Sequence, residues 1–303
     1  MKTSTSKRLR WNVAIWLAAG LFMTSTSGMA AGPIMPDPKA EARHQPQIEE
    51  TANGIPLVNI TAPSSGGVSR NEYEIFNVPD KGAILNNSYT LSKTELAGYV
   101  QGNNNMAERP AKIIVNEVTG AGSTSMDGFL EVAGNRADVV IANPNGITVN
   151  GGGFINTGKA FLTTGKPVYD GEDHLQRFDI TGGDILIEGK GLGGKETESL
   201  AILSRAVKIN AGIWAKDLHI TTGANTVDAK TLEASAIEGK GGCPAFALDT
   251  AAIGGMYAGR ITLVGTEKGL GVNNSGTWSA EDNLTLDWNG DLKNSGTIYS
   301  KGN

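Results

Sequence analysis

The sequence predicts an all-β protein, a parallel β-helix with coils of about 20 residues, and three observations support this. Short apolar or alternating segments recur along the chain, and each ends in a turn rich in asparagine and glycine. Glycine accounts for 41 of the 303 residues, whereas aromatic residues make up only 6%, which suits a thin core of small aliphatic side chains. Near the C-terminus the sequence NSGT at 274–277 recurs at 294–297, a step of 20 residues.

A coil of this size is too small to bury its own apolar side chains, so it has to stack on the next coil at about 4.8 Å. Residues 53–303 would then form about 12 such coils. An antiparallel sandwich would explain the strands but not the fixed step. Leucine-rich repeats also recur at this spacing, but their Leu-x-x-Leu-x-Leu pattern is missing.

The first 30 residues are predicted to be a secretory signal peptide. Basic residues between Lys2 and Arg10 precede an apolar run at 11–23, and the small-x-small sequence at 28–30 predicts cleavage between Ala30 and Ala31. The apolar run is shorter than the roughly 20 residues needed to span a membrane. Cleavage removes four basic and no acidic residues, so the net charge changes from -5 to -9. Such an acidic chain argues against nucleic acid as a partner.

Residues 31–52 contain four prolines among charged residues and show no sustained periodicity, which predicts a flexible leader with order beginning near Asn53. The segment Thr90–Gly102 could be one short helix or a loop, and it is the best helical candidate, with Ser92 as the N-cap and Glu95 three residues later. Strands are expected at 55–60, 74–78, 112–118, 128–133, 139–142, 147–149, 178–181, 185–187, 206–209, 218–221 and 261–264.

The stretch 137–163 is the clearest local pattern. Val139, Val140 and Ile141 form an apolar run that predicts a strand buried on both faces. The sequence Asn143-Pro144-Asn145-Gly146 then predicts a sharp turn, because proline fixes φ, asparagine tolerates left-handed geometry and glycine accepts positive φ. We interpret this motif first as a corner that sets the register of neighbouring coils, and alternatively as a contact for a transporter.

No motif in the chain predicts a cofactor, a metal site or a catalytic centre. Gly189–Gly194 matches GxGxxG but is not followed by a helical pattern, so an ordinary glycine loop is expected. The three histidines lack metal-ligand neighbours. Asp170, Glu172 and Asp173 are the densest acidic cluster and are interpreted as a solvated loop rather than as the carboxylates of a polysaccharide-active enzyme. Cys243, the only cysteine, is interpreted as a small apolar filler at a corner.

The segments KIIVNEVTG at 112–120, LEVAG at 130–134, ANPNGI at 142–147 and GFINT at 153–157 resemble the two-partner-secretion (TPS) domain of filamentous haemagglutinin. The same domain begins large haemolysins and contact-dependent inhibition toxins. The resemblance covers about residues 53–250, and residues 251–303 resemble the first adhesin-type repeats that continue the β-helix. It implies a right-handed parallel β-helix with a capped N-terminal end.

The resemblance also implies which residues of this chain correspond to two sequence motifs of the family. Residues 143–146 match the family's NPNG motif, and its second motif, Asn-Pro-Asn-Leu, falls at Asn103-Asn104-Asn105-Met106, where proline and leucine are replaced. Some toxin relatives carry a cysteine pair after the NPNG turn. This chain has residues 150–153 there instead, which we take as an argument against a close toxin relative.

The resemblance implies a non-enzymatic secretion module of a Gram-negative exoprotein, without cofactor. Its implied partners are the general secretory machinery and a dedicated outer-membrane transporter, a TpsB-type β-barrel with periplasmic binding domains. The module is expected to reach the cell surface or the medium through the periplasm and to nucleate folding outside. We expect the parent to be an adhesin, and alternatively a contact-dependent inhibition toxin or a haemolysin. The β-helix itself could also bind a ligand on a host or neighbouring cell.

Overall fold

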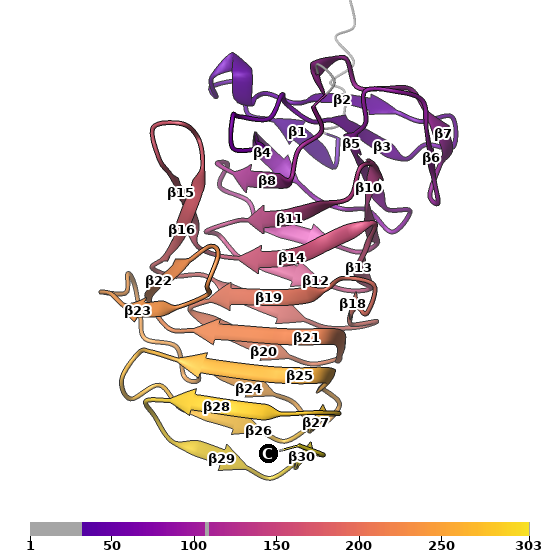
Figure 1. Ribbon diagram of the computed structural model, residues 1–303. Coiled ribbons are helices and arrows are strands. Elements are labelled where there is room, and N and C mark those ends of the chain that lie inside the picture. Colours follow the sequence, from indigo (N-terminus) through magenta and orange to yellow (C-terminus); the bar gives the residue numbers. More distant parts are fainter. Residues whose placement is uncertain (1–31, 107–108, 303) are drawn as a thin grey trace, which may run out of the picture. The chain divides into compact units, whose positions relative to one another are not determined.

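A computed structural model describes residues 32–106 and 109–302, which form a stack of β-strand coils (Figure 1). A complete coil places one strand segment on each of three faces, and neighbouring coils pair in parallel. The long strands β21 (Gly212–Thr222) and β25 (Gly255–Gly265) contribute first to one face and then to the next. The parallel pairing confirms the predicted β-helix and rules out the antiparallel sandwich.

The strands of the three faces follow one another in chain order. The first face contains β3 (Pro56–Asn59), β5 (Ala83–Asn87), β10 (Phe129–Gly134), β13 (Gly152–Ile155), β18 (Leu192–Gly194), the first halves of β21 and β25, β27 (Thr277–Ala280) and β30 (Thr297–Ser300). The second contains β4 (Val68–Phe76), β8 (Ile113–Val118), β11 (Ala137–Ala142), β14 (Thr157–Thr163), β19 (Ser199–Ser204), the second halves of β21 and β25, and β28 (Leu284–Trp288). The third contains β9 (Thr124–Met126), β12 (Ile147–Val149), β17 (Asp184–Ile187), β20 (Ala206–Ile209), β24 (Leu248–Thr250), β26 (Val272–Asn274) and β29 (Leu292–Asn294).

Coil length varies more than the sequence repeat suggested. Residues 124, 147, 185, 207, 248, 272 and 292 occupy equivalent places on the third face, so successive coils are 23, 38, 22, 41, 24 and 20 residues long. Only the last step has the predicted length of 20 residues. The expected count of about 12 coils is therefore wrong, because the third face has seven strands and two coils carry long insertions.

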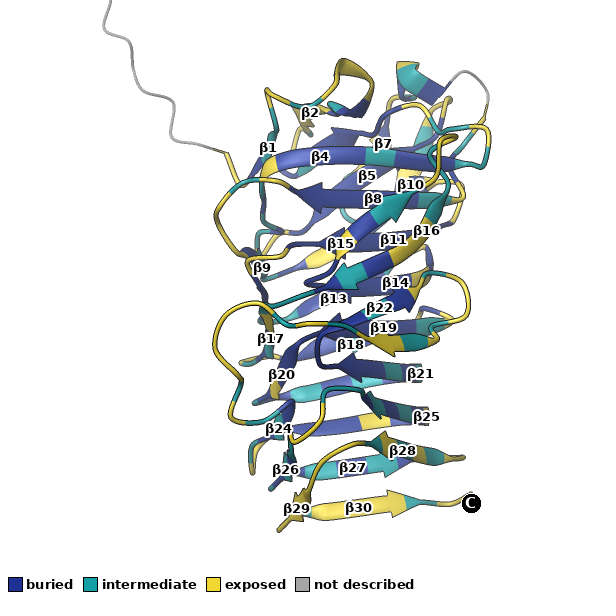
Figure 2. Cartoon of the chain, turned by 90° about the vertical axis from the view of Figure 1, so that its left-hand side faces the viewer, coloured by how far each residue is buried: buried dark blue, intermediate teal, exposed yellow. Residues whose placement is uncertain are grey.

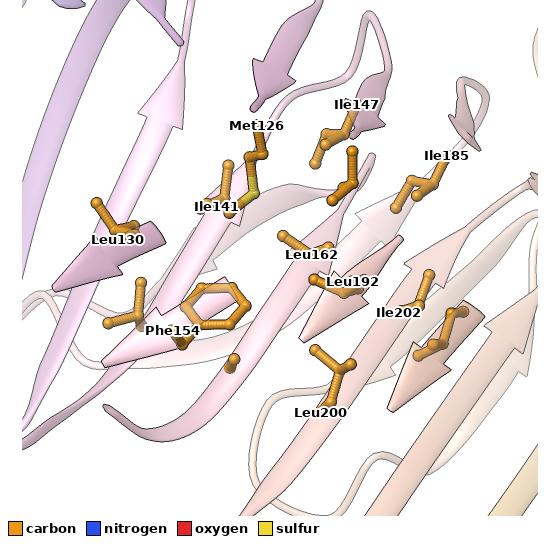
Figure 3. Close-up of a cluster of buried hydrophobic side chains, with 14 of the residues drawn as sticks. Met126, Leu130, Ile141, Ile147, Phe154, Leu162, Ile185, Leu192, Leu200 and Ile202 are labelled. Atoms are coloured by element: carbon orange, nitrogen blue, oxygen red, sulfur yellow. The ribbon is translucent and has the colours of Figure 1, made fainter. Parts of the chain in front are cut away.

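Inward-facing aliphatic side chains fill the space between the three faces. Leu130, Phe154 and Leu192 come from the first face and Ile147 and Ile185 from the third, and all are at most 2% exposed (Figure 3). Burial of this apolar surface is the main term that stabilises each coil, since a single coil cannot enclose a core. Exposure rises at the last strands, where Leu292 on β29 and Tyr299 on β30 lie at the surface (Figure 2).

The predicted flexible leader is wrong for its described residues, because 32–52 are part of the fold. The strand β1 (Ile34–Pro36) pairs antiparallel with β4, and β2 (Gln47–Glu50) pairs antiparallel with β3. A 3₁₀ helix, η1 (Ala42–His44), lies between them. These strands cover the N-terminal edges of the second and first faces, which would otherwise expose unpaired backbone groups. We call residues 32–52 the cap.

The predicted helix at 90–102 is also wrong. Strands β6 (Ser92–Thr94) and β7 (Gly98–Val100) form an antiparallel hairpin there. Gly98 has a φ of 71°, and the carboxylate of Glu131 accepts hydrogen bonds from the backbone N–H groups of residues 95 and 96. Residues 95 and 96 therefore lie in the turn of this hairpin, which the Glu131 carboxylate holds, and not in the first turn of a helix.

The two insertions meet in a separate four-stranded antiparallel sheet beside the second face (Figure 1). Its strands are β15 (Lys166–Tyr169), β16 (Leu175–Ile180), β22 (Asn225–Asp228) and β23 (Ala234–Ala236). Phe178 and Val227 from this outer sheet pack with Val140 and Ala201 of the coils in a second apolar cluster. Val139 and Ile141 face the main core. The prediction that 139–141 form a strand buried on both faces is therefore confirmed.

The C-terminal sequence repeat corresponds to directly stacked residues. Asn274 pairs with Asn294 in the parallel register, and its side-chain nitrogen donates to the Asn294 side-chain oxygen over 2.9 Å. In each repeat the asparagine oxygen also accepts a hydrogen bond from the backbone N–H two residues later. Asparagine at a coil corner thus closes its own turn and bonds to its equivalent in the next coil.

Candidate functional site

The NPNG sequence forms the corner between β11 and β12, as its turn residues predict. Asn143 is completely buried, whereas Pro144 and Asn145 are exposed at the tip of the turn. The backbone N–H of Gly146 donates to the carbonyl oxygen of Asn143 over 3.1 Å and closes a four-residue turn. The motif therefore divides into a buried base and an exposed tip.

The Asn143 side chain joins this corner to the preceding coil. Its nitrogen donates to the carbonyl oxygen of Gly122 and to the hydroxyl of Thr124, both over 3.0 Å. Its oxygen accepts a hydrogen bond of 2.9 Å from the backbone N–H of Asn145. Asn145 adds a bond from its own side chain to the carbonyl oxygen of Gly120 over 2.8 Å. These bonds hold the corner in register with residues 120–124.

Gly146 fits tightly between coils. It has a φ of 110°, and its carbonyl oxygen accepts a hydrogen bond of 3.0 Å from the backbone N–H of Thr124. A Cβ atom at this position would lie 3.0 Å from the carbonyl oxygen of Asp184 in the following coil. Glycine is needed here for both its backbone angle and its lack of a side chain.

Residues 103–106 build the same kind of turn at another corner, where the last three form the 3₁₀ helix η2 (Asn104–Met106). The Asn103 oxygen accepts a 2.9 Å hydrogen bond from the backbone N–H of Asn105, and the Asn103 carbonyl accepts one of 3.2 Å from Met106. The Asn103 side-chain nitrogen donates to the carbonyl oxygens of Ile60 and Asn86 over 2.8 and 2.9 Å.

The replacement of proline by Asn104 therefore leaves the turn intact. Asn103 is buried like Asn143, and Asn104 is exposed like Pro144. The two turns differ at the fourth position, where the Met106 side chain enters the main core. Proline presets the backbone angle but forms none of the hydrogen bonds that join the coils.

A group of charged residues that the sequence did not reveal ties the cap to the coils and the outer sheet. Arg70 on β4 contacts the carboxylates of Glu72 and Glu117 over 2.8 and 3.4 Å, and His44 in the cap lies 3.1 Å from Glu72. The Arg70 guanidinium also stacks on the ring of Tyr169 in the outer sheet, 4.4 Å from its centroid. Alternation along β4 places Arg70 and Glu72 on its outward side, but no local signal indicates that distant residues cover them.

Burial changes the ionisation of this group. It lowers the pKa of the His44 imidazole, and the nearby Arg70 charge lowers it further. Burial also raises the pKa of the Glu117 carboxyl, against the opposing effect of Arg70. His44 is thus held neutral against Glu72, and acid is expected to weaken this junction.

The second insertion is anchored by Arg205, which lies at the end of β19. Arg205 forms a two-pronged ion pair with Glu267, at 3.0 and 2.8 Å, and donates to the carbonyl oxygen of Lys240 over 2.7 Å. The hydrogen bond from Arg205 lowers the pKa of the Glu267 carboxyl. Cys243 in the same loop is exposed, so the prediction of a packed filler is wrong.

The residues weighed for other functions do not form a site in the described chain. Asp170 accepts hydrogen bonds from the backbone N–H groups of residues 172 and 174, so the acidic cluster is the loop between β15 and β16. Gly189–Gly194 ends with the strand β18 and not with a helix. Among residues 32–106 and 109–302, no three histidine, cysteine or acidic side chains cluster as metal ligands. The described helices include none that is long and apolar enough to cross a membrane. The predicted cleavage site at Ala30 and Ala31 lies outside the described residues.

The structure is a capped parallel β-helix with two inter-coil asparagine turns, the architecture that the resemblance to TPS secretion domains implies. The model of the TPS secretion domain matches residues 33–298, and the chain belongs to this family. The solved filamentous hemagglutinin secretion domain superposes with a TM-score of 0.75 at 28% identity, covering 90% of this chain and all of that one. Membership implies an outer-membrane transporter as partner and export from a Gram-negative cell.

Two relatives illustrate the proteins in which such a domain occurs. The chain is 43% identical to Toxin CdiA of Yersinia pestis over 95% of its length, and 48% identical to 16S rRNA endonuclease CdiA of Enterobacter cloacae over 75%. The chain spans only 9% and 7% of these proteins, so their names describe far longer molecules. The absence of a cysteine pair at 150–153 predicted that the chain has no close toxin relative, and the identity to Toxin CdiA shows that this prediction is wrong.

Proposed function

We propose that residues 32–302 are the part of an exoprotein that the outer-membrane transporter recognises and that starts β-helix folding outside the cell. The family match across 33–298 supports this most directly. The chain would reach the periplasm through the general secretory machinery, lose residues 1–30, and bind the periplasmic domains of a β-barrel transporter. The module acts through binding and folding and not through catalysis.

Within this function we assign different roles to the two parts of the NPNG turn. Asn143 and Gly146 hold the corner, because the first is buried in inter-coil hydrogen bonds and the second has no room for a side chain. Pro144 and Asn145 are exposed in the folded chain and contribute less to the corner, so we assign them to the transporter contact. Asn104, the exposed tip of the second turn, is a second candidate contact.

An export assay separates the structural role of Asn143 from the transporter contact assigned to Pro144 and Asn145. The chain is expressed with and without its transporter, and protein is measured in the medium and in the periplasm. We expect wild type in the medium only when the transporter is present. Pro144→Ala is expected to reduce export while the purified variant unfolds like wild type, whereas Asn143→Ala reduces both. Periplasmic retention of wild type in the presence of the transporter would contradict the secretion function. Normal export of Pro144→Ala and Asn104→Ala would remove the tips from the contact.

For the parent protein we propose a CdiA-like exoprotein that inhibits neighbouring cells on contact. The identities of 43–48% to CdiA proteins over most of the chain favour this over an adhesin. Competition between a producing strain and a susceptible neighbour, with and without the gene, tests the proposal. Unchanged competition together with loss of host-cell attachment would instead indicate an adhesin.

A further inference from the structure

An aromatic column runs along the outer side of the first face. Phe129, Gly153, Gly193, Trp214 and Tyr257 are successive register partners on five neighbouring strands, so their side-chain positions project from equivalent places. Phe129 is 44% exposed and Tyr257 is 39% exposed. The rings of Trp214 and Tyr257 lie nearly parallel, with 16° between their planes and 6.2 Å between centroids. Aromatic rings thus stand on both sides of two glycines.

The glycines make a gap in this column. Three coil steps separate Phe129 from Trp214, or about 14 Å between backbones. The Phe129 ring leans over Gly153, because a Cβ atom there would lie 2.4 Å from a ring carbon. The resulting cleft has a volume of about 350 Å³ and is lined by Phe129, Phe154, Gly193, Lys195, Glu196 and Trp214. Gly193 contributes only backbone to this lining, and the aromatic residues stand beside Lys195 and Glu196.

A polar cleft adjoins the aromatic one and shares Glu196 with it. It has a volume of about 560 Å³, and Glu95, Asn156 and Lys216 are among the side chains that line it. Its lining holds three glutamates, an arginine and a lysine, so both hydrogen-bond donors and acceptors are present and the charges nearly balance. Together the two clefts offer flat apolar surface next to a mixed polar rim.

We propose that this groove binds a neutral oligosaccharide, with one pyranose ring between Phe129 and Trp214 and its hydroxyl groups toward Glu196 and Lys216. The electron-rich face of an aromatic ring attracts the weakly positive C–H groups on the flat side of a sugar. The volumes are those of small-molecule sites. This proposal is independent of the secretion function, because the groove lies on a different face from residues 143–146.

Other occupants fit less well. A peptide cannot add a strand here, because β13 pairs with β10 on one side and β18 on the other, and β18 pairs with β21. Polyanions and anionic membrane surfaces are disfavoured because the charges in the rim nearly balance, so no excess of positive charge attracts them. A side chain of a protein partner remains the competing occupant, and the experiment distinguishes it.

Titration calorimetry of the purified chain with β-linked glucose and N-acetylglucosamine oligomers tests the proposal. These probes have equatorial hydroxyl groups and so present flat apolar ring faces. We expect saturable binding that Trp214→Ala and Phe129→Ala each weaken about tenfold. Tyr99→Ala is the matched control, because Tyr99 is 71% exposed on the β6–β7 hairpin outside the aromatic column, and it should bind like wild type. Thermal melting followed by circular dichroism verifies that the variants fold. Trp214→Tyr keeps an aromatic ring, so it should retain most of the affinity for the oligomers.

Either of two results would overturn the proposal. One is no saturable binding of any of these oligomers by wild type. The other is binding that neither Trp214→Ala nor Phe129→Ala weakens. If sugar binding is absent and these variants instead lose affinity for the transporter, the groove is a protein-binding surface. Export of Trp214→Ala at the wild-type level would show that failure of sugar binding leaves the secretion function untouched.

Discussion

Replacing Asn143 by alanine should destabilise the chain substantially, because this buried amide joins two coils. The substitution removes two hydrogen bonds donated by the side-chain nitrogen and two accepted by its oxygen from the backbone N–H and the side chain of Asn145. At about 1 kcal/mol for each net hydrogen bond, we expect a loss of about 4 kcal/mol in the free energy of unfolding. The partners left behind include the Gly122 carbonyl and the Asn145 N–H.

Urea unfolding followed by far-ultraviolet circular dichroism measures this loss. Asn145→Ala is the matched control. It removes hydrogen bonds from an exposed side chain to Gly120, Gly122 and Asn143, over 2.8, 3.5 and 3.1 Å. Water can replace these bonds at an exposed position, so the substitution should cost at most about 1 kcal/mol. If Asn143→Ala unfolds within about 0.5 kcal/mol of wild type, the amide does not hold the corner, and the structural role assigned to it is refuted.

Asn143→Asp sharpens the test because it keeps the shape of the side chain and its turn-closing oxygen. It replaces the donor facing Gly122 with a carboxylate oxygen, so two acceptors oppose each other at neutral pH. Protonation restores one donor. A carboxylate held against these acceptors has a raised pKa in the folded chain, so the stability difference between Asn143→Asp and wild type should shrink as the pH falls toward about 4 and stay small below it. A difference that is constant with pH would contradict this geometry.

The remaining predictions concern the cap and the second insertion. The pKa of His44 is lowered in the folded chain, so the unfolded chain binds more protons and the free energy of unfolding decreases as the pH falls through about 6.5. The melting temperature of wild type should therefore fall more between pH 7 and 5 than that of His44→Gln. Equal falls in the two melting temperatures would contradict this. Arg205→Met breaks the ion pair with Glu267 and should lower the free energy of unfolding by about 3 kcal/mol. In limited proteolysis, residues 223–247 of this variant should be cut faster than in wild type. An unchanged cleavage rate would show that Arg205 does not anchor the second insertion. Deleting residues 32–52 uncovers the edges of β3 and β4, so light scattering should detect association, whereas a stable monomer would show that the cap does not protect them.

Patterns dictated by local chemistry were predictable from the sequence. The run Val139–Ile141 has no polar position, and the structure buries it between the main core and the outer sheet. The NPNG residues gave the position of a turn, and the step from 274 to 294 gave the stacking of one coil on the next. Two of these signals lie within a few neighbouring residues. The third is a sequence repeat between two coils that no insertion separates.

Features that depend on distant partners were not predictable. The 178–181 segment alternates like a coil strand, yet β16 belongs to the outer sheet, because alternation does not identify the sheet that a strand joins. Residues 32–52 have a disorder-like composition, and their strands are ordered by pairing with β4 and β3. The resemblance located the second motif at 103–106, but the sequence did not show that this turn stays intact without proline, because its essential group is the Asn103 amide and the partners of that amide are distant.

The cap and the asparagine turns together give the stack a direction of folding. The cap pairs with the N-terminal edges of the first two faces, so further coils can join these faces only on the opposite side. Each new coil then finds hydrogen-bonding partners already fixed in the previous one, as Asn143 finds Gly122 and Thr124. A chain that emerges from a transporter with its N-terminal part first can therefore add coils in order, and each completed coil buries apolar surface that opposes return. This order requires the cap to form early, so a chain that lacks it should be exported more slowly than one carrying a defect in the last coil.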